Sequence, residues 1–342
     1  MKISFIVTYY NQEQYVKQSL ESILAIDKPC EWEIIVGDDG SSDGTVEIVK
    51  EYMAKYPEKI RLNIMPRDKT IKYDSVRRAS ANRLSALEMA TGDAFCTLDG
   101  DDFFCDKGFI KDALKIFDED KGVSVVAFGY KYFTNGAYGK EIILPAGARG
   151  HVDKRSYLRS FYLHAGACVH RLCWGKDKLN YIRKIGYFDD NNIVINSLNC
   201  GEMYAFDRPI YAYRQTGVSV YTSMNAVEQA LLNVQGFDVD KHLIDESYYA
   251  DLIQRNATCI LTVYIWNKRL KELLGKERYD RYLNSCQSAN DSLLYKLMKY
   301  DYLHQDTKRE VTSLINKLVL KHLKFTVKQY IGYVKHLWRS IK

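Results

Sequence analysis

The stretch FIVTYYNQEQYVKQSLESIL, residues 5–24, decides the fold class of this chain. It begins inside an apolar run at 3–7, which is typical of a buried strand and ends in the polar residues TYYN. Over residues 12–26 the apolar side chains recur at helical spacing, with Asn11 as the expected N-cap and Gln14 completing a capping box. A buried strand that leads directly into an amphipathic helix predicts one unit of an α/β fold.

The same alternation continues through the first 130 residues. Strands are predicted at 32–36, 60–65, 94–98 and 124–133, and helices at 45–55 and 77–90. Because these strands are apolar throughout, we expect a mostly parallel, Rossmann-like sheet covered by helices on both faces. Residues 203–214 predict two short strands around a turn, and a helical extension is predicted from about residue 224 to the end.

Cysteine and histidine give little sign of a soft-metal site. The eight cysteines contain no CxxC pair, and several, such as Cys96 and Cys259, lie in apolar runs as reduced core thiols do. This distribution favours a reducing, cytoplasmic compartment. His164 and His170 flank AGACV, and we expect structural or acceptor-lining roles for them rather than metal ligation.

The positive charge is concentrated at the C-terminus. Residues 311–342 contain seven Lys or Arg and no Asp or Glu. Because the formal net charge of the whole chain is +6, the net charge of residues 1–310 is −1. A nearly neutral body argues against nucleic-acid binding. Drawn as one helix, the tail gathers its basic residues within an arc of about 60°. It is expected either to contact an anionic membrane peripherally, or to pack on its own domain or on a second subunit in a homo-oligomer.

No membrane span is predicted from the sequence. The first residues turn polar too soon for a signal peptide, and no apolar run reaches 18 residues. The expected location is therefore the cytoplasm, with peripheral attachment to the inner face of the membrane if the tail binds lipid.

Three polar clusters follow predicted strands: TYYN (8–11), DDGSSDG (38–44) and DGDD (99–102). Ligands bind outside the carboxyl ends of parallel strands, so we expect the clusters at one crevice. Two carboxylates separated by Gly100 suit Mg²⁺ or Mn²⁺, whose open positions substrate phosphates fill. The tripeptide alone is common, and a loop of surface acids is the alternative interpretation. Glycine-rich nucleotide fingerprints are absent from the sequence, which favours phosphate binding through a metal.

In order and spacing, these segments resemble the family 2 glycosyltransferases, which have the GT-A fold. The resemblance is carried by the opening stretch, by EIIVGDDGSSDGT (33–45) and by NRLSALEMATGDAFCTLDGDDFF (82–104). It implies a GT-A domain over 1–222, with a nucleotide-sugar-binding half at 1–130 and an acceptor and catalytic-base half at 131–222. Residues 223–342 then form a helical C-terminal region.

The resemblance also implies roles for residues at the strand ends. Thr8 and Tyr10 would line the uracil, and Asp39 would accept from the pyrimidine N–H. Asp101 would coordinate the metal directly. Asp99 would contact the ribose, the metal or a water in the metal's shell.

Two further positions lie in the helix before the fourth strand. Asn82 matches a family asparagine. The family often has an arginine directly before it, where this chain has Ala81. Arg78, one turn earlier, would take the diphosphate-facing role.

The second half supplies the expected base. IGYFDDNNIVINSL (185–198) resembles the family's F-E-D element, which makes Asp190 the predicted catalytic base, with a helix N-cap as its alternative role. PIYAYRQTGVS (209–219) resembles the family's Y-R-x-x-x-x-x-S element, which places Arg214 near the diphosphate.

The implied reaction is inverting transfer of a sugar from a nucleotide sugar, with UDP as the expected nucleotide, to a hydroxyl of a saccharide or lipid-linked saccharide. Capsule, O-antigen or exopolysaccharide synthesis in bacteria is the expected setting. Two alternatives remain open: a sugar nucleotidyltransferase, which usually opens with a glycine-rich loop that TYYNQEQ does not match, and a nucleotide-binding scaffold without catalysis.

Overall fold

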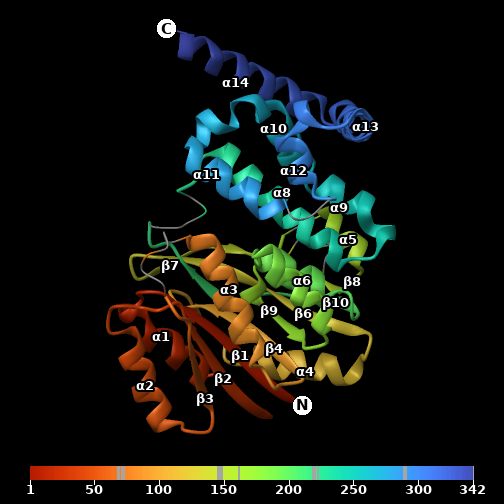
Figure 1. Cartoon of the computed structure of the whole chain (residues 1–342). Helices are drawn as coiled ribbons and strands as arrows, with labels where there is room; N and C mark the ends of the chain where they lie inside the picture. The colour runs from red at the N-terminus through yellow and green to blue at the C-terminus, as the bar shows by residue number, and fades with distance from the viewer. Residues whose placement is uncertain are drawn as a thin grey trace. The chain divides into compact units, whose positions relative to one another are not determined.

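The computed structural model describes the chain except for residues 68, 69, 71–73, 145–148, 161, 218–220, 222, 288–290 and 342, and except for the side chains of 160, 176 and 341. It divides into two compact units, residues 1–219 and 220–342 (Figure 1). Within its described residues, the second unit is built from helices alone.

The first unit contains all the strands of the described chain and seven α-helices. The strands are β1 (Lys2–Tyr9), β2 (Glu31–Asp38), β3 (Ile60–Ile64), β4 (Ala94–Asp99), β5 (Phe103–Phe104), β6 (Val123–Thr134), β7 (Ala137–Ile142), β8 (Gly150–Val152), β9 (Cys168–Arg171) and β10 (Glu202–Arg214). The helices are α1 (Glu13–Leu24), α2 (Thr45–Lys55), α3 (Ser75–Glu88), α4 (Phe109–Glu119), α5 (Lys154–Ser160), α6 (Lys176–Ile185) and α7 (Asp190–Ser197).

The second unit contains α8 to α14. These helices are α8 (Ala226–Leu243), α9 (Tyr249–Arg255), α10 (Ala257–Trp266), α11 (Leu270–Gln287), α12 (Leu293–Met298), α13 (Gln305–Lys321) and α14 (Leu323–Ile341). Among the described residues, no helix is both long enough and apolar enough to cross a bilayer.

The strands form one sheet in the order β3-β2-β1-β4-β9-β6-β10-β5, with β7 and β8 attached to β6 and β10. Strands β3, β2, β1 and β4 run parallel, as do β6 and β10, whereas β9 is antiparallel to both of its neighbours. The prediction of a mostly parallel sheet is therefore confirmed.

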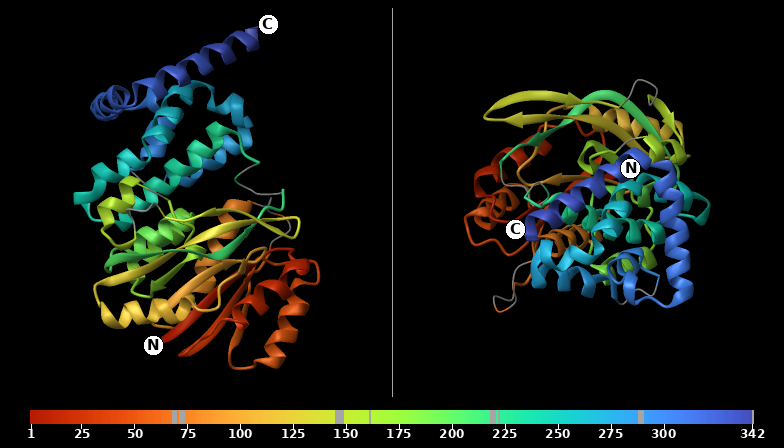
Figure 2. Two further views of the ribbon diagram at one scale, coloured as in Figure 1. Left: turned by 180° about the vertical axis from the view of Figure 1, so that it is seen from behind. Right: turned by 90° about the horizontal axis from the view of Figure 1, so that it is seen from above.

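Helices cover both faces of the sheet, which explains why its strands are apolar throughout (Figure 2). Phe5 and Val7 of β1 join a core with Leu20 of α1, Val49 of α2 and Phe117 of α4. Helix α3 packs on β1 and β2 from the other side. Each fully buried side chain of this size contributes about 1.5–3 kcal/mol, so two-sided burial of β1 fixes its register.

Three local predictions are wrong. Asn11 does not cap α1: it has a positive φ of 50°, and its Oδ1 accepts from Ser42 N at 2.8 Å, while Gln12 stands at the N-cap without a side-chain cap and Gln14 completes no capping box. Residues 203–214 form one irregular strand, because the shifts in pairing register beside Pro209 are absorbed within β10. The tail is two helices, broken at His322.

Two of the cysteines expected to be free are joined. Cys173 and Cys200 form a disulfide, with Cα atoms 6.4 Å apart. Both are exposed, so neither carries the apolar signal that identified the buried thiols. The other six cysteines are free, as predicted.

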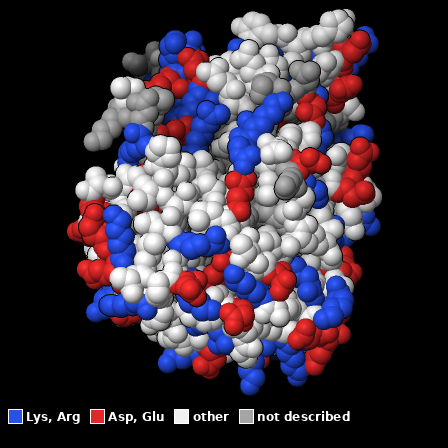
Figure 3. Space-filling view, turned by 60° about the horizontal axis from the view of Figure 1, so that its bottom comes forward, with Lys and Arg blue, Asp and Glu red and all other residues white. Residues whose placement is uncertain are grey.

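The surface carries both signs of charge. Figure 3 shows one face on which Lys and Arg are interspersed with Asp and Glu rather than gathered into a patch of one sign. This mixture is typical of a solvated surface.

Candidate active site

The carboxyl ends of β1, β2 and β4 bring the three polar clusters together. Thr8 is in register with Asp99 on one side and with Gly37 on the other. Beyond the strands, Gly100 N donates to Thr8 O at 2.9 Å and Asp39 N donates to Tyr9 O at 3.0 Å. The expected convergence at one sheet edge is therefore confirmed.

Gly100 allows the DGDD turn to lie directly on the sheet. A Cβ at this position would come within 2.1 Å of the ring of Tyr9, a buried residue of β1, and within 2.6 Å of Gln12 Oε1. The ring of Tyr9 is fixed by its hydroxyl contact with Ser19 Oγ at 2.5 Å. The turn therefore has no room for a side chain between its two flanking carboxylates.

We expect Gly100→Ala to lower the free energy of unfolding by about 1–3 kcal/mol, because the added methyl group overpacks against Tyr9. Gly139→Ala is the control, since its Cβ would make only ordinary contacts, with Tyr132 Cβ at 3.6 Å and Tyr132 O at 3.8 Å. Urea denaturation followed by circular dichroism measures both variants. Equal stability of the two variants would show that the turn accommodates a side chain.

The three acids of the DGDD turn lie in different environments. Asp102 is buried, and its carboxylate accepts from Tyr211 Oη at 2.7 Å and from the backbone N of Arg214 at 2.6 Å. Burial and then the charges of Asp101 and Asp99 raise the pKa of Asp102 well above its usual value. Asp102 thus fastens the turn to β10.

The carboxylate of Asp101 has fewer hydrogen-bond partners than that of Asp102. Burial, followed by the charge of Asp99, raises the pKa of Asp101, while hydrogen bonding from Gln12 opposes the rise. Carboxylates that repel one another in a partly buried turn are stabilised by a divalent cation, and oxygen is the ligand that Mg²⁺ and Mn²⁺ prefer. The residues present therefore fit a divalent metal.

Arg83 is a site residue that the sequence analysis missed. Its Nη2 donates to Asp99 Oδ1 at 3.0 Å, and its Nη1 donates to Phe188 O at 3.1 Å. Burial opposes ionisation of Asp99, but the charge of Arg83 and its hydrogen bond hold the pKa of that carboxyl below its usual value. The available signal was the position of Arg83 directly after Asn82, mirroring the family arginine that precedes this asparagine.

Arg78 and Asn82 contact residues at the carboxyl end of β2. Arg78 forms an ion pair with the buried carboxylate of Asp39, and its Nη1 donates to Pro66 O at 3.0 Å. Asn82 is buried and donates through Nδ2 to Gly37 O at 3.0 Å and to Tyr9 O at 3.4 Å. Asn82 therefore braces β1 against β2, and Arg78 holds the predicted base-reading carboxylate.

Tyr10 and Arg214 are placed at the same edge. The guanidinium of Arg67 lies 4.6 Å from the ring centre of Tyr10. Arg214 donates through Nε to Asp101 O at 2.5 Å and through Nη2 to Gln18 Oε1 at 2.6 Å. Its side chain thus spans from the DGDD turn to α1. Val218 and Ser219, at the end of the Y-R element, lie outside the described residues.

The structure separates the two acids at the start of α7. Asp189 is the N-cap: its Oδ1 accepts from Asn192 N at 3.0 Å, and its own N donates to Asn192 Oδ1 at 3.0 Å. The cap role considered for Asp190 thus belongs to its neighbour. The side chain of Asp190 is 33% exposed, and its Oδ2 lies 3.7 Å from His164 Nε2.

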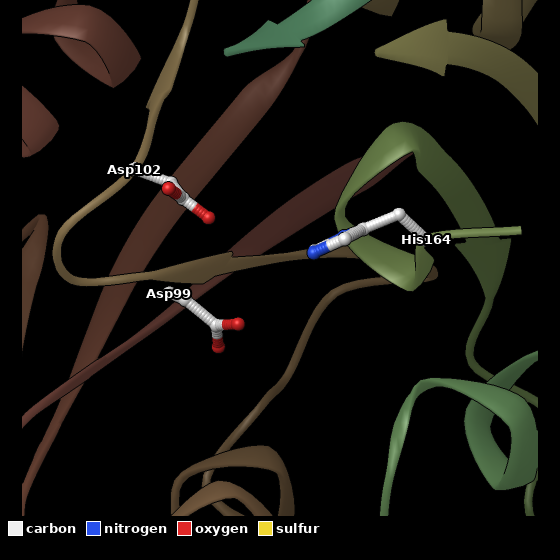
Figure 4. Close-up of side chains that lie close together, drawn as sticks. All are labelled: Asp99, Asp102 and His164. Atoms are coloured by element: carbon white, nitrogen blue, oxygen red, sulfur yellow. The ribbon is translucent and has the colours of Figure 1, made fainter. Parts of the chain in front are cut away.

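One cluster connects the two halves of the site. Asp99, Asp102 and His164 place a carboxylate oxygen or ring nitrogen each within 4.8 Å of one another, and their side chains point toward a common space (Figure 4). Among the described residues this is the one group of His, Cys, Asp and Glu with such spacing, and Asp101 is not part of it. Through His164, the DGDD turn lies beside Asp190.

Comparisons with known proteins match the first part of the chain, which includes the DGDD turn. The family described as "Glycosyl transferase family 2" matches residues 4–180. Putative glycosyltransferase EpsE of Bacillus subtilis is 39% identical over 101 residues, 30% of this chain and 33% of that protein. Poly(ribitol-phosphate) beta-N-acetylglucosaminyltransferase TarS of Staphylococcus aureus is 34% identical over 120 residues, 35% of this chain and 19% of that protein. The aligned stretch thus spans a third or less of these curated relatives.

The likeness in three dimensions extends further than the likeness in sequence. The crystal structure of S. aureus TarS 1–349 in complex with UDP-GlcNAc matches with a TM-score of 0.60 at 18% identity, over 98% of this chain and 92% of that chain. A likeness at this identity is evidence about fold. The prediction of a GT-A-type α/β fold with a helical C-terminal region is confirmed.

Proposed function

This chain belongs to glycosyl transferase family 2, and from that premise we propose that it transfers a sugar from a UDP-sugar to an acceptor hydroxyl with inversion. The observation that carries the proposal is the meeting of Asp39, the DGDD turn and Asp190 at one sheet edge. A nucleotide-reading acid, a phosphate-facing turn and a carboxylate that can act as a base are the parts that this reaction needs.

The chemistry divides between two groups of side chains. The acceptor oxygen bonds to the anomeric carbon as the bond from that carbon to the diphosphate breaks, and the electron pair leaves with UDP, through an oxocarbenium-like state. Asp190 takes the acceptor proton as general base. Asp101 and Asp99 would hold Mn²⁺ or Mg²⁺, which when bound neutralises charge on the leaving diphosphate. Arg214 lies beside Asp101 and adds positive charge there.

The donor class is proposed from Asp39 and from the relatives. Asp39 is buried at the end of β2, where a carboxylate can accept from the N–H of a pyrimidine. TarS has been crystallised with UDP-GlcNAc and with UDP. Uridine diphosphate is therefore the proposed carrier.

A donor screen tests this proposal. The full chain with Mn²⁺ is incubated with UDP-, GDP- and dTDP-sugars, and release of the nucleoside diphosphate is measured. Release from one or more UDP-sugars is expected, since water can replace a missing acceptor. Release from GDP-sugars alone would refute the choice of nucleotide, and no release from any donor in the presence of varied acceptors would refute the activity.

The acceptor is proposed to be a saccharide or lipid-linked saccharide of a bacterial surface polysaccharide. Relatives are named as enzymes acting on poly(ribitol-phosphate) or making poly-beta-1,6-N-acetyl-D-glucosamine. A lipid-linked acceptor lies at the membrane surface, so we also propose a cytoplasmic enzyme that contacts the membrane peripherally.

Helix α14 supplies the surface for that contact. One side packs on α10: Trp266 Nε1 donates to Gln329 Oε1 at 3.2 Å, and the Trp266 ring lies 5.2 Å from that of Tyr333. The adjoining side exposes large apolar residues, each 47% or more exposed: Leu323, Val327, Tyr330, Ile331, Val334 and Trp338. Packing on the chain itself therefore accounts for one side of α14 and leaves an apolar stripe exposed.

The positive charge on α14 favours an anionic lipid surface as the binding partner of this stripe. Lys324, Lys328, Lys335 and Arg339 are exposed and form a row along one edge of the stripe, and the described part of α14 contains no acid. Lysine and arginine near an anionic bilayer each contribute about 1 kcal/mol. An apolar stripe edged by basic residues is the pattern of a helix lying in the membrane interface.

We expect Ile331→Asp with Val334→Asp to lower binding to phosphatidylglycerol-containing vesicles by about tenfold or more, because each buried apolar side chain contributes about 1.5–3 kcal/mol. Tyr302→Asp is the control, since Tyr302 is 86% exposed and lies outside the stripe. Co-sedimentation measures binding. Equal pelleting of the double variant and the unmodified chain would refute the membrane contact, as would a change in oligomeric state without a change in pelleting.

A further inference from the structure

His164 occupies a position in the site that its predicted lining role does not explain. It immediately precedes the 3₁₀ turn Ala165–Ala167, and its side chain is only 12% exposed. The rings of Tyr211, Tyr213 and Tyr130 surround it, with centroids 4.5, 5.5 and 5.9 Å away. The imidazole of His164 points toward the side on which Asp99 and Asp102 lie (Figure 4).

A backbone contact fixes the tautomer of the ring. Gly166 N donates to His164 Nδ1 at 3.1 Å. A neutral imidazole has one donor nitrogen and one acceptor nitrogen, so accepting at Nδ1 places the proton on Nε2. The nitrogen that faces Asp190 Oδ2 at 3.7 Å is therefore an N–H donor.

This assignment conflicts with metal ligation by His164. A metal is bound by the lone pair of an imidazole nitrogen, and here the Nδ1 lone pair is used by Gly166 while Nε2 carries the proton. The spacing of Asp99, Asp102 and His164 resembles a ligand set, but the ring presents a proton to the carboxylates.

We infer that His164 is a positioning residue: its Nε2–H binds one oxygen of Asp190 and holds the other toward the acceptor hydroxyl. The inference rests on the proposed glycosyl transfer with Asp190 as base. The separation of 3.7 Å exceeds that of a hydrogen bond, and catalytic hydrogen bonds are often long before substrate binds and shorten in the complex. Because Asp190 begins α7 and the cap role is met by Asp189, Asp190 has no cap contact to orient its carboxylate.

The arrangement keeps the two acids in separate roles. Arg83 holds Asp99 on the sugar-donor side of the site through a hydrogen bond of 3.0 Å. His164 holds Asp190 on the side of the acceptor hydroxyl. Misplacing a reacting group by about 1 Å can lower the rate by about 10²-fold, so the loss of this donor affects turnover more than substrate binding.

The test uses the full chain and two substitutions. His164→Leu removes the donor, and His164→Gln places an amide N–H near the former Nε2. We expect His164→Leu to lower kcat by about 10²-fold with donor KM little changed, and His164→Gln to recover most of the loss. His151→Leu is the matched control, because His151 Nε2 also lies 3.6 Å from a carboxylate, that of Asp120, but outside the site.

Two measurements without turnover complete the test. Mn²⁺ affinity, measured by electron paramagnetic resonance, should be the same in the unmodified chain and in His164→Leu. Long-range ¹H–¹⁵N spectra should show His164 as the Nε2–H tautomer. A kcat for His164→Leu equal to that of the unmodified chain, a parallel loss of Mn²⁺ affinity, or an Nδ1–H tautomer would each overturn the inference. An unmodified chain that releases no nucleotide would instead overturn the proposed function, and the tautomer would still test the position of the proton.

Discussion

Asp190→Asn is expected to lower kcat for sugar transfer by about 10²–10⁴-fold while leaving UDP affinity unchanged, because a positioned general base contributes about that much. The amide keeps the shape of the side chain but cannot take the acceptor proton. It also leaves the start of α7 intact, since the capping box belongs to Asp189 and Asn192. Initial rates with saturating donor, together with UDP titration by calorimetry, measure the two effects separately.

Asp189→Asn gives the contrast. Asp189 accepts from Asn192 N and from Tyr187 Oη at 2.7 Å, so its replacement should lower stability more than it alters chemistry in the molecules that remain folded. If Asp190→Asn retained turnover and Asp189→Asn lost it, Asp190 would be refuted as the catalytic base and Asp189 would take that role.

Removing the metal should weaken donor binding. With EDTA, or in Asp101→Asn, we expect UDP to bind at least about 10- to 100-fold more weakly, the range seen when residues supporting a metal site are replaced. The carboxylate of Asp101 accepts from the neutral side chain of Gln12, whereas Asp99 is paired with Arg83 and Asp102 is bound to β10 through Tyr211 and Arg214. Titration of UDP with and without Mn²⁺ is the measurement.

Asp118→Asn serves as the control, because Asp118 is a surface acid with a side chain 71% exposed. It should bind UDP as the unmodified chain does, with and without Mn²⁺. Equally tight UDP binding in EDTA and in Mn²⁺ would exclude a coordinating role for the DGDD turn. A response confined to Asp99→Asn, with Asp101→Asn unchanged, would move that role to Asp99.

The sheet edge could be predicted from sequence because strand identity and chain order determine it. Apolar runs such as ISFIV and AFCTL are buried on both faces, and the carboxyl ends of parallel neighbours must meet. The positions of Thr8, Asp39 and Asp99 at one sheet edge follow from that rule alone.

The side-chain partners could not be predicted, because they depend on distances across the fold. The partner of each arginine, Asp99 for Arg83 and Asp39 for Arg78, depends on how α3 lies over the sheet. The contact of His164 with Asp190 joins segments 26 residues apart and requires the turn at Ala165–Ala167 to set the ring. The disulfide of Cys173 and Cys200 likewise depends on the path of α6 and α7.

The attachment of Asp102 to β10 has a consequence for building chimaeras. A segment cut at residue 130, the proposed end of the nucleotide-sugar-binding half, and grafted onto another chain would lose Tyr211 and Arg214, the two residues that hold this buried carboxylate. A buried acceptor without its donors costs about 1–3 kcal/mol, and more when it is charged. The two proposed halves are therefore not interchangeable modules, because the DGDD turn has to be kept together with β10.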